Sequence, residues 1–206
     1  GENPDDISYE KGATKKLTSF GLEVESKVFP GDISDEAFKK EFAAINADAS
    51  VDGILMLRPL PKQINEQDIE KMIDPAKDLD GISPVNIAKV FSGDTSGFAP
   101  CTAEAVVCML KMNDIALSGK RVAVVGRSMV VGRPLSMLLL HENATVTICH
   151  SRTASLPEVC READILTACV GKAAMINHTY VKKDAVVIDV GINVDENGKL
   201  CGDVDF

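Results

Sequence analysis

The sequence predicts an α/β protein in which residues 118–206 form a parallel β-sheet flanked by helices. Three observations support this fold class. After position 118, short apolar runs of strand length alternate with helical patterns, as in sheets whose parallel strands are joined by helical crossovers. One of these runs leads directly into Gly126 at a strand–turn–helix junction. A Ser-Gly-Lys turn at residues 118–120 separates this half of the chain from the helix before it.

Helices and two short strands are expected in the first half of the chain. The helices are expected at residues 7–20, 34–47, 65–74 and 102–112. Ser34, Asn65 and Thr102 are of the residue types that cap helix N-termini. Residues 22–29 alternate like a half-buried strand. Residues 53–57 form a continuous apolar run, which is typical of a strand that is buried on both faces.

The second half of the chain is more regular. Strands are expected at residues 121–125, 145–149, 165–170 and 186–190. One helix is expected between Gly126 and about His141, and another near residues 156–162. The alternation of these elements predicts parallel strands.

The composition excludes some function classes. With 45% hydrophobic and 26% charged residues, the chain has the composition of an ordinary globular protein. Its 22 basic and 31 acidic residues give a formal net charge of −9. Nucleic acid is therefore not expected as a partner, because phosphate neutralisation dominates such binding. No apolar run has the length that spans a bilayer, so no membrane partner is expected.

The cysteines, histidines and chain ends lead to three further expectations. The six cysteines contain no C-x-x-C pair, which predicts free thiols in a reducing compartment and hence a cytoplasmic protein. The three histidines are scattered, so no metal site is expected. The chain opens on a loop-like segment and closes at GDVDF without a terminal helix. We expect that a starting segment and a closing segment are missing.

A candidate phosphate loop begins at Gly126. This glycine permits a tight turn after a buried strand, and Gly132 follows six residues later within the next helix. The N–H groups at a helix N-terminus attract phosphate. The pattern is not G-x-G-x-x-G, so by itself it fits an ordinary strand–helix turn equally well. The strand–turn–helix–strand context favours the nucleotide-binding interpretation.

The tip of the second strand in this half bears on the choice of cofactor. NAD-specific domains carry Asp or Glu there to bind the ribose hydroxyl, whereas Arg accommodates the 2′-phosphate of NADP. Residues 149–153 read CHSRT, without a carboxylate, and Arg127 lies in the neighbouring loop. We predict NADP as the cofactor, because the Ser151 hydroxyl and guanidinium groups bind phosphate. The alternative is that these residues are solvated surface groups.

A set of motifs resembles one known family over essentially the whole chain. The motifs are GENPDDISY at residues 1–9, DGIL and PLP within 52–61, KDLDG at 77–81, PCT at 100–102, GKRVAVVGRSMVVGRP at 119–134, HSRT at 150–153, and VVIDVGIN with GKLCGDVDF within 186–206. In this order they resemble the bifunctional methylenetetrahydrofolate dehydrogenase/methenyltetrahydrofolate cyclohydrolase family, also called FolD-like. The GRS-x-x-VG-x-P loop and the DVGIN…GDVDF pair are specific to that family as a set.

The resemblance implies two α/β domains, a reaction and a set of site residues. Residues 1–117 would be a folate-binding catalytic domain, and residues 118–206 a Rossmann-like NADP-binding domain. The family oxidises 5,10-methylenetetrahydrofolate by hydride transfer to NADP and hydrolyses the methenyl product to 10-formyltetrahydrofolate. It pairs through its nucleotide domains, which implies a homodimer. Its catalytic folate contacts match Tyr9 and Asp80, and its nucleotide contacts match Gly126, Arg127, Ser128, Ser151 and Ile192.

Two positions depart from the family's pattern. The lysine of Tyr-x-x-x-Lys is Ala13 in this chain, and the glutamine of V-Q-L-P is Leu57. In the family this lysine is the main proton-transfer group of the hydrolysis step, and alanine and leucine cannot supply a general base. Hydride transfer asks less of such groups, because the cofactor carries that chemistry. Dehydrogenase activity is therefore expected, while cyclohydrolase activity is in doubt.

Several alternatives stay open at this point. Lys16 lies on about the same helix face as Tyr9, and Arg58 adjoins Leu57, so either cation could replace the lost lysine. For Lys16 an ordinary solvated charge is the favoured interpretation, and for Arg58 both interpretations stand. The two replaced positions also agree with a catalytically impaired folate- and nucleotide-binding protein. A dehydrogenase for another small substrate would share the layout but not the folate motifs.

Overall fold

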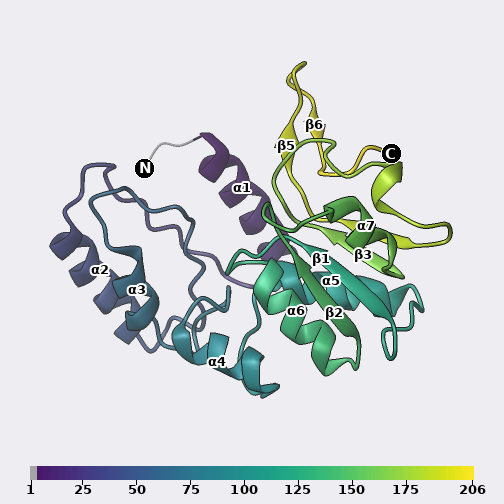
Figure 1. Ribbon diagram of the computed structural model, residues 1–206. Coiled ribbons are helices and arrows are strands. Elements are labelled where there is room, and N and C mark those ends of the chain that lie inside the picture. The colour runs from purple at the N-terminus through teal and green to yellow at the C-terminus, as the bar shows by residue number, and fades with distance from the viewer. Residues whose placement is uncertain (1–3) are drawn as a thin grey trace. The chain divides into compact units, whose positions relative to one another are not determined.

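The structure, a computed structural model, describes residues 4–206 (Figure 1). The chain forms two compact units, Gly1–Lys77 and Asp78–Phe206, and each is described by itself. The stretch GENPDDISY begins outside the described residues, whereas Tyr9 lies within them. The division of roles at residues 117 and 118 stays a prediction.

Three helices make up the regular structure of the first unit. They are α1 (Pro4–Ser19), α2 (Asp35–Ala47) and α3 (Glu66–Met72). The hydroxyl of Ser34 accepts a hydrogen bond from the backbone N–H of Ala37 at 3.2 Å and so caps α2, as predicted. Phe38 and Phe42, one helical turn apart, are buried and stacked with ring centroids 6.2 Å apart. This apolar stripe holds α2 in the unit.

The prediction of two strands in the first unit is wrong. Residues 22–29 and 53–57 belong to no strand, although the N–H of Ile54 donates to the carbonyl of Lys77 at 2.6 Å. Leu22 and Val28 are more than half exposed rather than packed against a neighbour. A strand is stabilised by the hydrogen bonds of a partner strand, and the apolar pattern of a segment does not supply that partner.

Two helix caps and one helix also differ from expectation. Asn65 precedes α3, but its side chain makes no capping bond, and its backbone N–H donates to Asp35 instead, at 2.8 Å. Thr102 lies within the first turn of α5 (Cys101–Met112), whose N-cap residue is Pro100. The helix α4 (Pro84–Ser92) was not expected, although it has a capping serine before it, a first-turn proline and a left-handed glycine after it.

The second unit contains the predicted parallel sheet. Its strands are β1 (Arg121–Val125), β2 (Thr145–Cys149), β3 (Ile165–Ala168) and β4 (Val186–Asp189), all parallel and in the order β2-β1-β3-β4. Val125 pairs with both Cys149 and Ala168, so the carboxyl ends of the strands meet at one edge. The predicted α/β, Rossmann-like class is confirmed.

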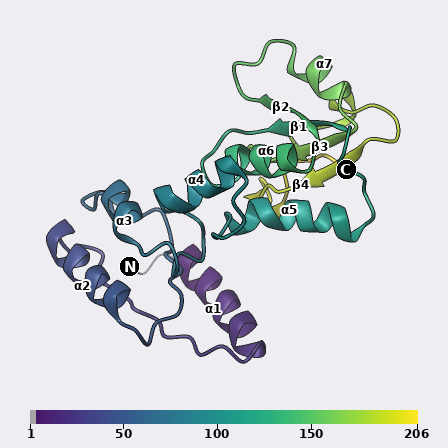
Figure 2. The ribbon, with the colours of Figure 1, turned by 90° about the horizontal axis from the view of Figure 1, so that it is seen from below.

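Helices cover both faces of this sheet (Figure 2). Val122 and Val124 point to the face covered by α5 and α6 (Gly132–His141). Ala123 and Val125 point to the other face, toward α7 (Leu156–Arg161) and the short 3-10 helix η1 (His178–Tyr180). The alternation of side chains along a strand thus produces two separate cores.

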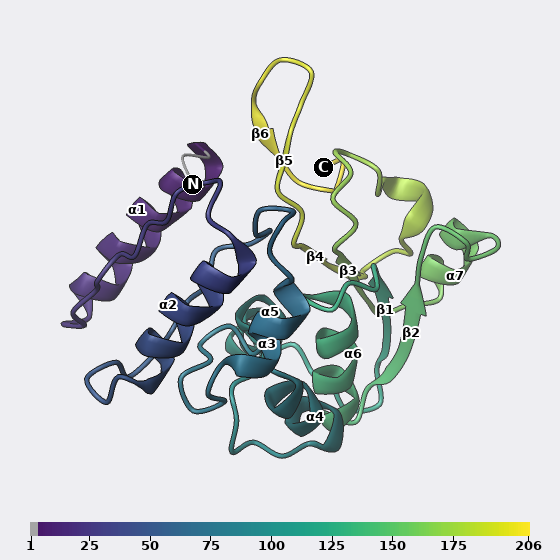
Figure 3. The same ribbon diagram turned by 90° about the vertical axis from the view of Figure 1, so that its left-hand side faces the viewer.

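A short hairpin follows the sheet. It is formed by β5 (Asn193–Val194) and β6 (Leu200–Cys201), which pair antiparallel. The hairpin extends away from β3 and β4 in Figure 3, and its side chains Val194 and Leu200 are largely exposed. This hairpin was not predicted from the sequence.

Candidate functional site

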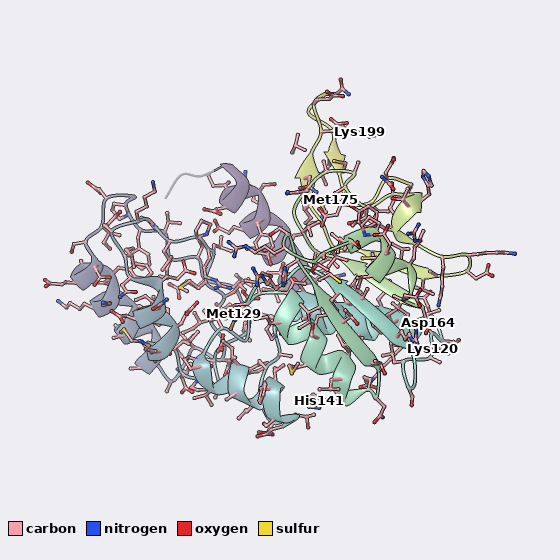
Figure 4. The ribbon with its side chains drawn as sticks, viewed as in Figure 1. Lys120, Met129, His141, Asp164, Met175 and Lys199 are labelled. Carbon is pink, nitrogen blue, oxygen red and sulfur yellow. The ribbon has the colours of Figure 1, made fainter. Side chains whose placement is uncertain are left out.

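Four loops gather at the carboxyl edge of the sheet, one after each parallel strand. They begin at Gly126, His150, Cys169 and Val190. The connections from β1 and β3 leave in opposite directions, because β2 lies beyond β1 and β4 lies beyond β3. Ligands of open α/β sheets bind outside the carboxyl ends of the strands at such a switch point. Figure 4 marks Met129 at this edge and Lys120 and Asp164 at the opposite, amino edge.

The turn after β1 is shaped by a close approach of two glycines. Gly126 has a φ of 136° and is buried, and a Cβ atom there would lie 2.7 Å from the Cys169 sulfur. Gly132 begins α6 against this turn, where a Cβ would lie 2.6 Å from the carbonyl carbon of Gly126. Both positions therefore need glycine, so that backbone packs directly against backbone.

Ser128, in the loop before α6, accepts hydrogen bonds from the backbone at the start of this helix. The hydroxyl of Ser128 accepts from the N–H of Val131 at 3.1 Å and of Gly132 at 3.5 Å, while its carbonyl accepts from Arg133 at 3.0 Å. The sequence predicted free N–H groups here that could face a phosphate. In the structure, the N–H groups of Val131, Gly132 and Arg133 are instead bonded to Ser128. Arg127, the preceding residue, is exposed.

The loop after β2 forms a tight turn that presents Ser151 and Arg152 to solvent. Thr153 closes it twice, because its hydroxyl accepts from the N–H of His150 at 2.9 Å and its own N–H donates to the carbonyl of His150 at 2.8 Å. The imidazole Nδ1 of His150 accepts from the N–H of Arg152 at 3.1 Å. Ser151 and Arg152 are exposed, and no carboxylate lies among residues 149–153.

Ile192 lies at the carboxyl edge as well. It follows β4 and is 80% exposed, which is unusual for a large aliphatic side chain. Its neighbours in the chain are held by two carboxylates, those of the half-buried Asp189 and the fully buried Asp203. Both aspartates lie in the motifs DVGIN and GDVDF, and neither was among the predicted site residues.

Asp80 is positioned by the loop that contains it. Asp78 is fully buried, and its carboxylate accepts from the N–H of Ile82 at 3.0 Å, the N–H of Ser83 at 2.8 Å and the amide of Asn86 at 2.9 Å. Asp78 lies in the KDLDG motif but was not among the predicted site residues. A carboxylate with three donors fixes this turn firmly.

The same loop lies against the start of α5. Gly81 has a φ of 63°, and a Cβ there would lie 2.7 Å from the backbone nitrogen of Pro100. The thiol of Cys101 donates to the carbonyl of Leu79 at 3.0 Å. Burial and the nearby Asp80 carboxylate raise the pKa of the Cys101 thiol. The KDLDG and PCT motifs thus form one half-buried acidic corner around Asp80.

An apolar cavity of about 330 Å³ lies between α4 and the start of α6. Phe91 and Ile87 line it from α4, and Met129 and Arg133 line it from the loop and the first turn of α6. Pro100 completes it. The cavity is therefore lined both by the PCT motif, through Pro100, and by the loop after β1, through Met129.

The remaining predicted catalytic positions lie in the first unit. Tyr9 is 59% exposed on α1, and Ala13 lies one turn later on the same helix. The ammonium group of Lys16 lies 4.9 Å from the ring centre of Phe20. Leu57 is half-buried.

Arg58, the second candidate for a replacement cation, is half-buried and paired. Its Nη1 lies 3.4 Å from the carboxylates of both Glu66 and Glu70. Glu66 also accepts from the N–H of Leu60, at 3.2 Å. The guanidinium group is thus held against α3.

The structure brings five of the predicted site residues to one edge. Gly126, Arg127, Ser128, Ser151 and Ile192 all lie on loops that follow the parallel strands. Asp80 belongs to the same unit, and Tyr9, Ala13 and Leu57 belong to the first. Among the described residues, no group of His, Cys, Asp or Glu side chains is arranged to hold a metal ion. No described helix is long and apolar enough to cross a membrane.

Comparison with family models gives two matches that together span most of the chain. The tetrahydrofolate dehydrogenase/cyclohydrolase catalytic domain matches residues 1–80, and the NAD(P)-binding domain of the same family matches residues 100–206. A curated relative, bifunctional protein FolD of Clostridium kluyveri, is 53% identical over 206 residues, which are 100% of this chain and 72% of the relative. The protein of that name from Clostridioides difficile is 54% identical over 205 residues, 100% and 71% of the two chains.

Solved structures agree with these matches. The bifunctional enzyme FolD, methylenetetrahydrofolate dehydrogenase/cyclohydrolase, from Campylobacter jejuni superposes with a TM-score of 0.98 at 37% identity, covering 100% of this chain and 73% of that one. A methylenetetrahydrofolate dehydrogenase-cyclohydrolase from Trypanosoma brucei, complexed with NADP cofactor and inhibitor, superposes with a TM-score of 0.93 at 32% identity, covering 100% and 72%.

Proposed function

Because the chain belongs to the tetrahydrofolate dehydrogenase/cyclohydrolase family, we propose that it oxidises 5,10-methylenetetrahydrofolate with NADP. The observation that carries the proposal is the carboxyl edge of the sheet, where the nucleotide-contact positions of the family converge. Residues 1–117 would bind folate and residues 118–206 would bind NADP.

The residues at this edge fit NADP. Arg127 and Arg152 can neutralise a phosphate, and the hydroxyl of Ser151 can donate to it. The β2 tip lacks the carboxylate that would accept from a 2′-hydroxyl and repel a 2′-phosphate.

In the oxidation, the methylene carbon of the folate loses a hydride and becomes the methenyl cation. NADP, when bound, supplies the hydride acceptor. The chain's own residues bind and orient the two rings, so that the transfer occurs within a preorganised pair. We assign the contact to the pterin ring to Asp80, which lies in the loop that the Asp78 carboxylate holds, and the contact to the nicotinamide end to Ile192.

The hydrolysis step depends on residues that this chain lacks. Addition of water to the methenyl cation gives 10-formyltetrahydrofolate and releases one proton, which a general base must accept. We propose that this activity is weakened, because Ala13 and Leu57 stand where the family has lysine and glutamine. Arg58 is paired with Glu66 and Glu70, which favours a structural role for its charge.

A second candidate function follows from the same two positions. Tyr9 would then be part of a site that binds folate without turning it over, and the chain would be a catalytically impaired folate- and nucleotide-binding protein. Ala13 and Leu57 favour this candidate. The dehydrogenase is preferred, because the loops that would hold NADP carry the family's residues.

Two wider features are proposed by resemblance. The family pairs through its nucleotide domains, so we propose a homodimer, which light scattering of the purified protein tests. A cytoplasmic location is proposed from the free state of all six cysteines.

One preparation tests both activities separately. The purified protein is mixed with 5,10-methylenetetrahydrofolate and either NADP or NAD, and reduced cofactor is followed at its absorbance band. The methenyl compound is supplied alone in a second assay, and its decay is compared with the rate in buffer. Reduction of NADP with slow methenyl hydrolysis is expected. Tight binding of both ligands without turnover would select the impaired protein, and a preference for NAD would refute the cofactor assignment.

A further inference from the structure

A buried carboxylate occupies an anion-binding loop at the end of β3. The side chain of Asp203 is fully buried, and it accepts from three consecutive backbone N–H groups, of Val170 at 2.6 Å, Gly171 at 3.1 Å and Lys172 at 2.8 Å. Successive N–H groups that converge in this way form an anion-binding nest. In this chain the anion is internal and is supplied from 31 to 33 residues further along.

The same carboxylate reaches the loop after β4. Its Oδ1 accepts from the side-chain amide of Asn193 at 2.9 Å. Asn193 begins β5 and directly follows the exposed Ile192. Asp203 therefore joins the loop after β3 to the residue next to Ile192.

A second carboxylate, Asp189, holds Asp203 itself. Asp189 ends β4, and it accepts from the N–H of Gly191 at 3.0 Å, of Asp203 at 2.9 Å and of Val204 at 3.0 Å. The two aspartates thus bracket Ile192, because Asp189 fixes Gly191 on one side of it and Asp203 fixes Asn193 on the other.

The packing around the pair leaves no room for other side chains. A Cβ at Gly191 would overlap the carboxylate of Asp203, and a Cβ at Gly202 would overlap the carboxylate of Asp189. These two glycines explain the sequences VGIN and GDV by contact rather than by turn geometry, since neither has a positive φ.

The pair also reaches the turn after β1. Burial and the nearby Asp203 carboxylate raise the pKa of the Cys169 thiol to about 11. This thiol donates to the carbonyl of Val125 at 3.1 Å and lies where a side chain at Gly126 would be. One connected set of contacts therefore links the ends of β1, β3 and β4.

We propose that Asp189 and Asp203 are positioning residues for the cofactor, which set the place of Ile192 and of the loop at residues 170–172 without touching the ligand. The proposal rests on the proposed NADP-dependent function. Loops whose backbone is held by hydrogen bonds to carboxylates lose little freedom when a ligand binds, and a misplacement of about 1 Å in such a site weakens catalysis strongly.

The test uses the whole chain with Asp203→Asn, which keeps the shape but replaces one acceptor oxygen by a donor. The fluorescence of NADPH measures its Kd, and hydrogen exchange measures the protection of residues 170–172 and 191–193. We expect the Kd to rise roughly tenfold or more and protection of these amides to fall. The KM for the folate substrate should change much less than the KM for NADP.

A matched control lies at the opposite edge of the same sheet. Asp164 accepts from the N–H of Arg121 at 2.9 Å and from Lys182 at 2.8 Å, so Asp164→Asn also removes a carboxylate that links strands. It should leave the Kd for NADPH unchanged. If Asp203→Asn does not fold, Asn193→Ala removes one bond of the set, and the same change in NADPH binding, in smaller degree, is expected.

The outcomes separate this proposal from the function on which it rests. Wild-type protein that binds no NADPH would refute the proposed function, whereas the exchange measurement would still report whether Asp203 orders the two loops. Asp203→Asn with unchanged NADPH affinity and unchanged exchange would overturn the positioning role. If Asp203→Asn and Asp164→Asn lose NADPH affinity to the same extent, the loss reflects general destabilisation of the sheet. That result would also overturn the positioning role.

Discussion

The first residue of α6, Gly132, lies directly against the backbone of Gly126, so that a Cβ at position 132 would come within 2.6 Å of the Gly126 carbonyl carbon. Only glycine allows this contact, because the obstructing atoms are backbone and cannot rotate away. The relationship explains why this turn needs glycine at both positions, although the pattern is not G-x-G-x-x-G.

Gly132→Ala should therefore impair cofactor binding. The added methyl group pushes α6 away from the turn, and we expect the KM for NADP to rise roughly tenfold, since a small displacement in a positioned site is costly. Steady-state kinetics measure it. Gly31→Ala is the control, because a Cβ there meets nothing within 4 Å. Equal KM values for Gly132→Ala and wild type would refute the contact's role.

Ser151→Asp should reverse the cofactor preference. A carboxylate at the β2 tip repels the 2′-phosphate of NADP and can accept from the 2′-hydroxyl of NAD. We expect kcat/KM for NADP to fall roughly tenfold or more, about 1.4 kcal/mol per factor of ten, with NAD affected less. Ser118→Asp is the control, because Ser118 is exposed just before β1 at the amino edge of the sheet. A parallel loss with both cofactors would contradict the assignment of Ser151.

Ala13→Lys combined with Leu57→Gln should raise the hydrolysis of the methenyl compound. The lysine restores a proton-transfer group, which contributes roughly 10²-fold or more to such reactions. The decay of the methenyl absorbance measures the rate, and hydride transfer should change little.

Ala37→Lys controls for the added charge, because Ala37 is exposed on α2. If the double variant hydrolyses no faster than wild type, the loss of activity lies elsewhere than in these two positions.

Asp78→Asn should destabilise the second unit. The buried carboxylate accepts from two backbone N–H groups and one side-chain amide, and the replacement amide turns a donor toward one of them. We expect the free energy of unfolding to fall by about 1–3 kcal/mol. Urea unfolding measures it, with the exposed Asp32→Asn as the reference. The KM for the folate substrate should also rise, because Asp80, the proposed pterin contact, lies in the loop that Asp78 holds.

The stability that Asp203 contributes should depend on pH in a defined direction. Burial alone would raise the pKa of Asp203, but the hydrogen bonds from Asn193 and from the backbone of residues 170–172 outweigh it and lower the pKa below the ordinary 3.8. Because the pKa of Asp203 is lower in the folded state than in the unfolded state, its ionised carboxylate stabilises the fold, and this contribution is complete at pH values above the unfolded-state pKa. That contribution is lost as the pH falls from there through the folded-state value.

Asp203→Asn, which cannot ionise, should therefore be less stable than wild type at neutral pH, and the difference should narrow as the pH falls below about 3.8. Urea midpoints at several pH values measure the difference. A gap that stays constant down to the lowest pH at which both proteins fold would contradict the charge-assisted bonds.

The parallel sheet could be predicted from the sequence, because its strands are short, largely apolar segments that alternate with helical patterns. Residues 122–125 of β1 are all buried, so both faces of this strand are covered, and a continuous apolar run in the sequence indicates such a strand. The expected strands at residues 22–29 and 53–57 failed, because a strand also needs a partner that no local pattern names. The helix α4 has caps that are local signals, and these were overlooked.

The candidate site was predictable in part. The loops with Gly126 and Ser151 follow predicted strands, so their meeting at one edge follows from parallel topology. Asp189 and Asp203 were quoted as motif residues without a role, since their significance lies in backbone groups that are remote in the chain. Val170 lies 33 residues from Asp203, and no spacing rule relates them.

The sequence by itself determined the family, the parallel arrangement and the absence of a carboxylate at the β2 tip, because these depend on residue types at fixed places. Only the tertiary structure decided that the Asp203 carboxylate fills a nest after β3 and that Arg58 is paired with Glu66 and Glu70. The physical reason is that a hydrogen bond or ion pair depends on distances of about 3 Å. Folding brings such partners together from positions whose separation along the chain carries no information about contact.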